Sequence, residues 1–190
     1  NASKPSMKWV SDITYIQTQE GFLYLTTVID LYDRKVIGWS LSHTMSTEET
    51  SLAAWKMAIK NRSIKKGMLF HSDRGIQYCS AMYIELLMKD EIKISMTQSG
   101  SPYENAMAER VNGIIKNEFY TKSLFQNYKE AKKHIDKAVA KYNSIRPHSS
   151  IDYLTPENAH LSNGILKKRW KKYAYKKKES EFSKASAECI

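Results

Sequence analysis

The sequence contains little of what marks several common classes of protein. It has only two cysteines in 190 residues, so we expect neither a disulfide framework nor a cysteine-based metal site, and a reducing cytoplasm is the expected environment. No apolar run approaches the roughly 20 residues that would span a membrane, and no secretory signal is visible. The chain begins with Asn-Ala-Ser, and we expect residues 1–6 to be a tag remnant or linker.

Acidic residues are also fewer than basic residues. Thirty Lys and Arg residues oppose twenty Asp and Glu residues, which gives a net charge of +10 and a pI near 9.4. This balance favours a polyanionic partner, with nucleic acid ahead of an anionic membrane surface. The alternative is that the positive charge serves solubility alone.

The basic charge is concentrated in KKRWKKYAYKKK, residues 167–178, within an expected basic C-terminal tail over 163–190. Eight of these twelve residues are Lys or Arg, interleaved with three aromatic residues. The composition suits phosphate contact combined with base stacking, and the alternative is a solubilising tail. The candidate DNA contacts in this segment are Lys167, Lys168, Arg169, Lys171 and Lys172.

Three runs rich in β-branched and aromatic residues predict strands over 9–16, 22–30 and 35–42. The joints between the runs are short, so we expect antiparallel hairpins. The first run is apolar on both faces apart from a few polar residues. We therefore expect a central strand that is covered on both sides.

Helices and short strands alternate in the rest of the chain. Ser46 and Glu49 have the spacing of a capping box, and Leu52, Trp55 and Ile59 follow at helical spacing. The remaining expected elements are a strand over 67–72, a helix over 80–90 capped by Ser80, a strand over 92–96, a loop over 97–102, and helices over 103–119 and 128–144. The sequence therefore predicts an α/β fold with a five-stranded mixed sheet, three antiparallel strands followed by helix-connected strands, and flanking helices.

Two aspartates lie in or beside the apolar runs. Asp12 is inside WVSDITYI, and Asp73 ends the run MLFHSD. If the fourth strand lies parallel beside the first, the two carboxylates meet at one end of the sheet, where their repulsion would keep one protonated unless a cation intervenes. Oxygen ligands without a His or Cys cluster suit Mg²⁺ or Mn²⁺. Asp73 taken alone could instead cap a turn.

A third carboxylate should come from the helix over 103–119, where the candidates are Glu104, Glu109 and Glu118. At about 100° per residue, Glu109 lies roughly opposite the apolar stripe, Glu118 falls close to the stripe, and Glu104 precedes the first full turn. The apolar stripe consists of Met107, Val111, Ile114 and Ile115, and the polar face carries Asn105, Asn112 and Lys116 as candidate DNA contacts. Charged residues on such a face are, however, more often simply solvated.

Five segments of the chain together resemble a known family: WVSDITYI, LYLTTVIDLYDRKVIGWSLS, FHSDRGIQYCS, SMTQSGSPYENAMAERVNGIIKNEFY and YNSIRPHSSIDYLTP. They are similar to the integrase-type catalytic core of bacterial insertion-sequence transposases, in particular those made as an OrfAB fusion, and more distantly to retroviral integrases. The resemblance covers roughly residues 7–160. The 35 residues between Asp73 and Glu109 match the family's hallmark spacing.

The resemblance implies a ribonuclease-H-like core over residues 7–162 and an Asp-Asp-Glu triad of Asp12, Asp73 and Glu109. The triad would catalyse the reaction and hold Mg²⁺ or Mn²⁺, with two ions in the active complex. The implied function is metal-dependent cleavage and strand transfer at insertion-sequence ends, in a bacterial cytoplasm and associated with the nucleoid. The implied partners are DNA, as element ends and target, further copies of the chain assembled on DNA, and an upstream helix-turn-helix region; no membrane partner is expected.

The remaining matched residues have less defined roles. We expect His71 to lie beside the site rather than to bind metal, and the YN..RPH motif, residues 142–148, to hold the last helix against the core rather than to act in catalysis. Two alternative functions stay open. One is a nuclease of the same fold that cuts without joining, and the other is a catalytically inactive nucleic-acid-binding module.

Overall fold

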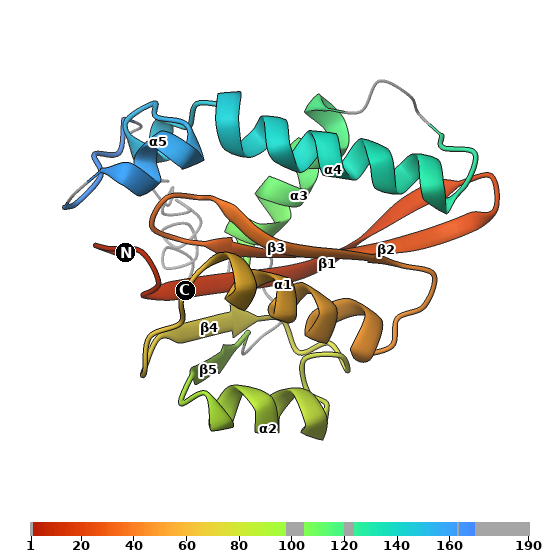
Figure 1. The fold of residues 1–190 in the computed structure, drawn as a ribbon, viewed down its shortest axis with the longest axis horizontal. Helices are drawn as coiled ribbons and strands as arrows, with labels where there is room; N and C mark the ends of the chain where they lie inside the picture. Colours follow the sequence, from red (N-terminus) through yellow and green to blue (C-terminus); the bar gives the residue numbers. More distant parts are fainter. Residues whose placement is uncertain (1, 98–104, 120–123, 163, 170–190) are drawn as a thin grey trace, which may run out of the picture.

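The chain is built on one mixed sheet of five strands in the order β3-β2-β1-β4-β5 (Figure 1). The computed structural model describes residues 2–97, 105–119, 124–162 and 164–169. The strands are β1 (Lys8–Thr18), β2 (Gly21–Asp30), β3 (Val36–Ser42), β4 (Leu69–Ser72) and β5 (Lys93–Met96). Antiparallel pairing joins β1, β2 and β3, whereas β4 is parallel to β1 and β5 is parallel to β4. The predicted sheet is confirmed, including the parallel placement of the fourth strand beside the first.

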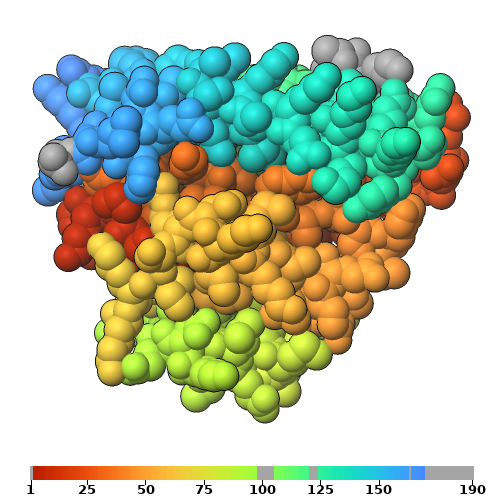
Figure 2. All heavy atoms as spheres, viewed as in Figure 1, coloured from red at the N-terminus to blue at the C-terminus, as the bar shows by residue number. Residues whose placement is uncertain are grey.

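Helices cover both faces of this sheet. The helical elements are the π-helical turn η1 (Glu48–Leu52), α1 (Ala53–Asn61), α2 (Ala81–Lys89), α3 (Ala106–Glu118), α4 (Tyr128–Ile145), the 3₁₀ turn η2 (Ser149–Ile151) and α5 (Pro156–Leu161). One hydrophobic core lies under α3 and α4, and a second lies under α1 and α2. Figures 1 and 2 show the layers, with α4 above the sheet and α2 at the bottom. None of the helices in the described ranges is long and apolar enough to cross a bilayer.

The central strand β1 contributes to both cores. Trp9 is fully buried and packs against Trp55 of α1, with ring centroids 5.5 Å apart. Val10 and Ile16 belong to the other core, under α3 and α4. Successive side chains of a strand point to opposite faces, so a strand that is covered on both sides must be apolar on both. The predicted central position of this strand is confirmed.

Helix α1 packs very close to β3 at Gly38. A Cβ atom added at Gly38 would lie 2.6 Å from the backbone nitrogen of Ala58 and 2.8 Å from the Cβ of Ala58. The helix therefore turns its small residues to the sheet, and Ala54, Trp55 and Ala58 are its buried positions. Ile59, which shares the helical spacing of Leu52 and Trp55, is 37% exposed. The spacing of large apolar residues cannot predict a helix–strand contact that is made by glycine and alanine.

The predicted helix caps are found in part. Ser80 accepts a hydrogen bond from the backbone N–H of Tyr83, as predicted. Ser46 Oγ accepts a 3.3 Å bond from the backbone N–H of Glu49, but the Glu49 carboxylate bonds to the hydroxyl of Ser42 instead of returning to Ser46. The reciprocal half of the predicted capping box is therefore missing, and the helix opens through η1. The short elements η2 and α5 were not predicted.

The outer segments of the described chain also lie on the core. Ser6, in the segment expected to be a linker, is buried, and its backbone N–H donates to Asp30 over 2.8 Å. The Tyr32 hydroxyl donates to the carbonyl oxygens of Ser162 and Gly164, 2.9 and 3.0 Å away. The described part of the expected tail therefore follows the surface of the core closely.

Candidate active site

The parallel pairing of β1 with β4 brings Asp12 and Asp73 to the same end of the sheet. The paired residues Lys8 and Leu69 differ by 61 in residue number, as do Asp12 and Asp73. Asp73 follows β4 directly, and its Oδ1 accepts a 2.9 Å hydrogen bond from the backbone N–H of Gly75. This bond turns the chain away, so that Asp73 remains at the tip of the strand.

The pKa of Asp12 is shifted by the groups that surround it at this end of the sheet. Burial, together with the negative charges of Asp73 and Glu109, raises the pKa of Asp12 to about 6, against the lowering effect of a hydrogen bond from Asn112. Carboxylates that are near one another resist simultaneous ionisation. Asp12 is therefore under the influence of both other members of the predicted triad.

Helix α3 is fastened to β1 through one face. The amide Nδ2 of Asn105 donates to the backbone oxygen of Ser11 over 2.9 Å, and Nδ2 of Asn112 donates to Oδ2 of Asp12 over 2.9 Å. One turn further, Lys116 Nζ lies 3.3 Å from the hydroxyl of Thr14. Residues four and seven positions apart share a helix face. Glu109 lies between the two asparagine contacts on this face, and its side chain is exposed.

The donor chemistry at this end of the sheet suits a hard divalent cation. Mg²⁺ is commonly bound by one or two carboxylates with water completing its octahedron, so a cage made entirely of protein ligands is not required. Within the described ranges, no three His, Cys, Asp or Glu side chains converge closely enough to form such a cage. A cation would relieve the like-charge conflict that raises the pKa of Asp12. The residues present therefore fit Mg²⁺ or Mn²⁺.

A buried polar network supports the strand that carries Asp12. The hydroxyl of Ser11 donates to the backbone oxygen of Thr27, and it lies 2.8 Å from the hydroxyl of the buried Tyr78. Gln77 Nε2 donates to the backbone oxygen of Met45. The segment after Asp73 is thus held against β1 and against the turn before η1, which fixes the position of Asp73 relative to Asp12.

The predicted DNA contacts fall into two groups. Asn105 and Asn112 are only 5% and 3% exposed, so their burial and their bonds to β1 argue for a positioning role in place of DNA contact. The half-buried Lys116 stays a predicted phosphate contact. Lys167, Lys168 and Arg169 are exposed, and Arg169 also forms an ion pair with Asp152. Lys171 and Lys172, like Glu104, lie outside the described residues.

The YN..RPH motif anchors α4, as predicted. The side-chain amide of Asn143 accepts from the backbone N–H of Val36 and donates to its carbonyl oxygen, over 3.0 and 2.9 Å. Arg146 forms two 2.6 Å hydrogen bonds with the carboxylate of Glu118 and so joins α4 to α3. Glu118 is therefore engaged in this ion pair rather than at the active site.

A buried charge cluster at the C-terminal end of β2 was not predicted from the sequence. Arg62 bonds to the carboxylates of Asp30 and Asp33 over 2.6 and 2.8 Å, and both aspartates are fully buried. His160 Nδ1 lies 3.0 Å from Asp33 and brings α5 into the cluster. A buried charge requires a partner. The two aspartates could have been flagged beside an apolar run, but their distant partners could not have been identified.

A five-stranded mixed sheet with helices on both faces, with Asp12 within β1 and Asp73 at the tip of the neighbouring β4, defines a ribonuclease-H-like fold. The chain matches the family model described as integrase core domain over residues 2–102, and a second model of the same description over residues 90–156. The chain therefore belongs to the integrase core domain family.

Curated relatives are transposases of insertion sequences. The chain is 35% identical over 158 residues to the transposase for insertion sequence element IS904 of Lactococcus lactis subsp. lactis (strain IL1403), covering 83% of this chain and 62% of that protein. It is 38% identical over 172 residues to transposase InsF for insertion sequence IS3A of Escherichia coli (strain K12), covering 85% of this chain and 56% of that protein. The chain thus spans less than two thirds of the length of these relatives.

Solved structures of retroviral integrases share the fold. The HTLV-2 integrase catalytic core domain in complex with magnesium superimposes with a TM-score of 0.66 at 20% identity, covering 84% of this chain and 99% of that chain. A chain of the simian T-cell lymphotropic virus intasome in complex with PP2A regulatory subunit B56 gamma gives a TM-score of 0.71 at 16% identity, covering 91% of this chain and 60% of that chain. These likenesses confirm the predicted ribonuclease-H-like fold.

Proposed function

We propose that this chain is the catalytic domain of a bacterial insertion-sequence transposase, which cleaves DNA at the element ends and joins those ends to a target. The observation that carries the proposal is that Asp12 lies level with Asp73 at one end of the sheet and feels the charges of both Asp73 and Glu109. The transposase relatives support the reaction class. The 35-residue spacing supports Glu109 as the third carboxylate.

Asp12, Asp73 and Glu109 would hold Mg²⁺ or Mn²⁺, with two ions in the active complex. When bound, the metal supplies charge stabilisation at phosphorus and makes an attacking hydroxyl group more acidic. Asn112 holds the Asp12 carboxylate in one orientation through Oδ2. The exposed Glu109 faces the substrate side from α3. The magnesium named with the HTLV-2 integrase core supports this choice of cation.

Cleavage and joining are the same displacement with different nucleophiles. Water attacking the scissile phosphorus releases a 3′-hydroxyl, and that 3′-hydroxyl attacking a target phosphorus joins the strands. Both reactions proceed in line at phosphorus, so a single carboxylate site serves both steps. The chain's own contribution is to position the carboxylates and to orient the DNA, both of which lower the barrier without covalent chemistry by the protein.

The proposed partners follow from charge and from the relatives. A net charge of +10 suits DNA, as element end and as target. The structures named as dimeric, trimeric and intasome forms support assembly of several copies on DNA. The additional length of the curated relatives leaves room for an upstream helix-turn-helix region that reads the element ends. Such a protein would work in the bacterial cytoplasm on nucleoid DNA.

The proposal is tested by incubating the chain with labelled element-end DNA and Mn²⁺ or Mg²⁺. We expect nicked and joined products from the wild type and neither product from Asp73→Asn. Nicks without joined products would favour a nuclease of the same fold. Binding without either product would favour an inactive nucleic-acid-binding module.

A further inference from the structure

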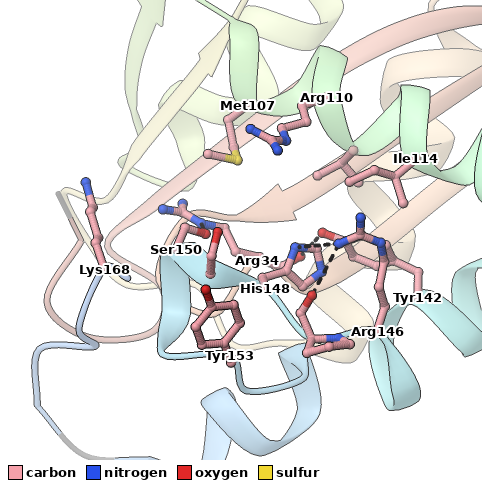
Figure 3. Close-up of a pocket in the computed structure, with 13 residues that line it drawn as sticks. Arg34, Met107, Arg110, Ile114, Tyr142, Arg146, His148, Ser150, Tyr153 and Lys168 are labelled. Carbon is pink, nitrogen blue, oxygen red and sulfur yellow. Dashed lines mark hydrogen bonds between the residues drawn. The ribbon is translucent and has the colours of Figure 1, made fainter. Parts of the chain in front are cut away.

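A cavity of about 340 Å³ lies beside α3, away from β1 (Figure 3). Met107, Arg110 and Ile114 of α3 line one side of it. The segment that follows α4, including His148, lines another side, and Arg34 from the turn before β3 completes the wall. Helix α3 therefore has the carboxylate site on one side and this basic pocket, as we call the cavity, on another.

The basic pocket has four cationic side chains and no carboxylate in its lining. The cations come from separate segments of the chain: Arg34, Arg110, Arg146 and Lys168. Figure 3 shows Arg110 on the α3 side of the cavity, with Arg34 and Arg146 below it in the view. The Glu118 carboxylate is already bound by Arg146 through two hydrogen bonds. Like charges gathered in this way create a positive potential that an anion relieves.

The positive potential also affects the pKa of His148. Burial, together with the positive charges of Arg146 and Arg34, lowers the pKa of His148 to about 4, against the raising effect of the Glu118 carboxylate. The imidazole is therefore neutral near pH 7, and Arg146 Nη1 lies 3.3 Å from its Nδ1. The buried Nε2 of His148 has no hydrogen-bond partner among the described residues. The described lining of the pocket thus contains no negatively charged side chain to balance its cations.

Hydrogen-bond donors remain available at the mouth of the pocket. Arg110 is exposed and forms no hydrogen bond or ion pair within the described part of the chain. The hydroxyls of Ser150 and Tyr153 also line the pocket, and Ser150 accepts from Arg34 Nε over 3.2 Å. A guanidinium fork beside hydroxyl groups matches the geometry of a phosphate oxygen pair.

We infer that the basic pocket binds a backbone phosphate of the DNA strand that occupies the carboxylate site. The inference rests on the proposed function in that its ligand is DNA. A cavity of about 340 Å³ has room for a phosphodiester group together with bridging waters.

The position of Arg110 connects the two sites. Arg110 follows Glu109 directly, so the two side chains leave α3 about 100° apart, with Cα atoms about 3.8 Å from each other. Ala106, which is exposed, and Gly113, which is half-buried, lie on the same strip of the helix, and a Cβ added at Gly113 would meet nothing within 4 Å. A strand whose phosphate lies at Glu109 can therefore cross α3 over small side chains and place a neighbouring phosphate at Arg110.

Salt titrations of DNA binding test the inference. The 190-residue chain is compared with Arg110→Ala, Arg110→Lys and the control Lys60→Ala, which removes one exposed charge from α1 on the opposite face of the sheet. The readouts are the Kd for a labelled duplex at several salt concentrations and the amide resonances of residues 148–153. A parallel titration uses inorganic phosphate alone.

We expect Arg110→Ala to make the log–log salt slope shallower than that of Lys60→Ala by about one unit, because each phosphate contact contributes about −0.9. Arg110→Lys should restore the slope, and DNA should shift the resonances of residues 148–153 in the wild type but much less in Arg110→Ala. Equal slopes for Arg110→Ala and Lys60→Ala would overturn the inference. Inorganic phosphate that binds tightly and is not displaced by DNA would assign the pocket to a free anion instead.

The same experiment separates this inference from the proposed function. A wild-type chain that neither binds nor cuts DNA would reject the proposed function, and the inference with it. A wild-type chain that cuts DNA, with Arg110→Ala indistinguishable from Lys60→Ala, would reject the inference alone. Thermal unfolding of each variant checks that the fold is intact, which we expect because the Arg110 side chain makes no described bond.

Discussion

Asn112 on α3 donates a 2.9 Å hydrogen bond from Nδ2 to Oδ2 of Asp12 on β1, while its Oδ1 accepts a 2.8 Å bond from the hydroxyl of Thr27 on β2. The opposite orientation of the amide would turn its oxygen towards the carboxylate, which would be repulsive. Asn112 therefore both fastens the helix that carries Glu109 and orients the first aspartate. Both of its partners lie on the two central antiparallel strands of the sheet.

Replacing Asn112 with Ala should lower the free energy of unfolding by ~1–3 kcal/mol, because the buried Thr27 hydroxyl loses its acceptor. Adding Thr27→Val to that variant should recover part of the loss, because removing both polar partners costs less than leaving one unsatisfied. Chemical denaturation of the two variants and of Thr27→Val alone measures the coupling. Additive effects would show that the bridge does not hold the helix.

Asp12→Asn and Asp73→Asn should each reduce cleavage by ~10³-fold or more, since losing several kcal/mol of charge stabilisation at ~1.4 kcal/mol per tenfold has that effect. DNA binding should be unchanged or slightly stronger, because each substitution removes a negative charge that repels phosphate. A matched control is Asp136→Asn on the exposed side of α4. Cleavage retained in either active-site variant would place the site elsewhere.

Gly38→Ala should destabilise the protein by ~1–3 kcal/mol or more, because its Cβ would meet backbone atoms of α1 that cannot move independently. The matched control is Gly113→Ala, where the new Cβ meets nothing and a helical glycine is replaced by a better helix former. That substitution should stabilise by ~0.5–1 kcal/mol. Thermal and chemical unfolding measure both, and equal effects of the two substitutions would contradict the close packing of α1 on β3.

Much of the fold could be predicted because its signals are local. Runs of β-branched and aromatic residues predicted β1, β2 and β3, and the helix predicted over 128–144 corresponds to α4. The parallel position of β4 beside β1 was the condition under which Asp12 and Asp73 were expected to meet, and the structure meets that condition. Local sequence patterns were therefore enough to predict the strands of the sheet, and simple chemistry was enough to single out the two aspartates.

The features that escaped prediction depend on distant pairs. Arg62 meets Asp30 and Asp33 only after α1 has packed on the sheet, and no spacing in the sequence encodes that contact. Asn112 looked like a surface residue on a polar helix face, whereas β1 and β2 bury that face. Polarity predicts exposure only when no polar partner covers the residue, and partners from other strands cannot be read from helical spacing.

The pKa of His148, lowered to about 4, predicts a dependence of stability on pH. The unfolded chain binds a proton at His148 near pH 6.5, whereas the folded chain resists protonation. The stabilisation is therefore complete above pH 6.5 and is lost as the pH falls towards 4. We expect the free energy of unfolding of the wild type to fall more steeply over this window than that of His148→Gln. A constant difference between the two proteins from pH 7 to pH 4 would contradict the lowered pKa.

Deleting residues 170–190 should make the salt dependence of DNA binding shallower. Five lysines lie between positions 171 and 178, and each phosphate contact contributes about −0.9 to the log–log slope on duplex DNA. We expect a change of several units with the core still folded, because this cut leaves in place Gly164, which accepts a hydrogen bond from Tyr32, and Arg169, which pairs with Asp152. A chain with these five lysines replaced by glutamine is the matched control. Equal slopes for the wild type and the truncated chain would reject phosphate contact by the deleted segment.

The most direct test of the central claim is strand transfer from a pre-cleaved element end, with a free 3′-hydroxyl, into a supercoiled target in the presence of Mn²⁺. The wild type and Glu109→Gln are compared at equal DNA occupancy, because this substitution removes only the charge of the exposed carboxylate on α3. We predict joined products from the wild type, with their yield reduced by ~10³-fold in the variant. Joined products at equal yield from the two proteins, or none from a wild type that binds both DNAs, would contradict the account.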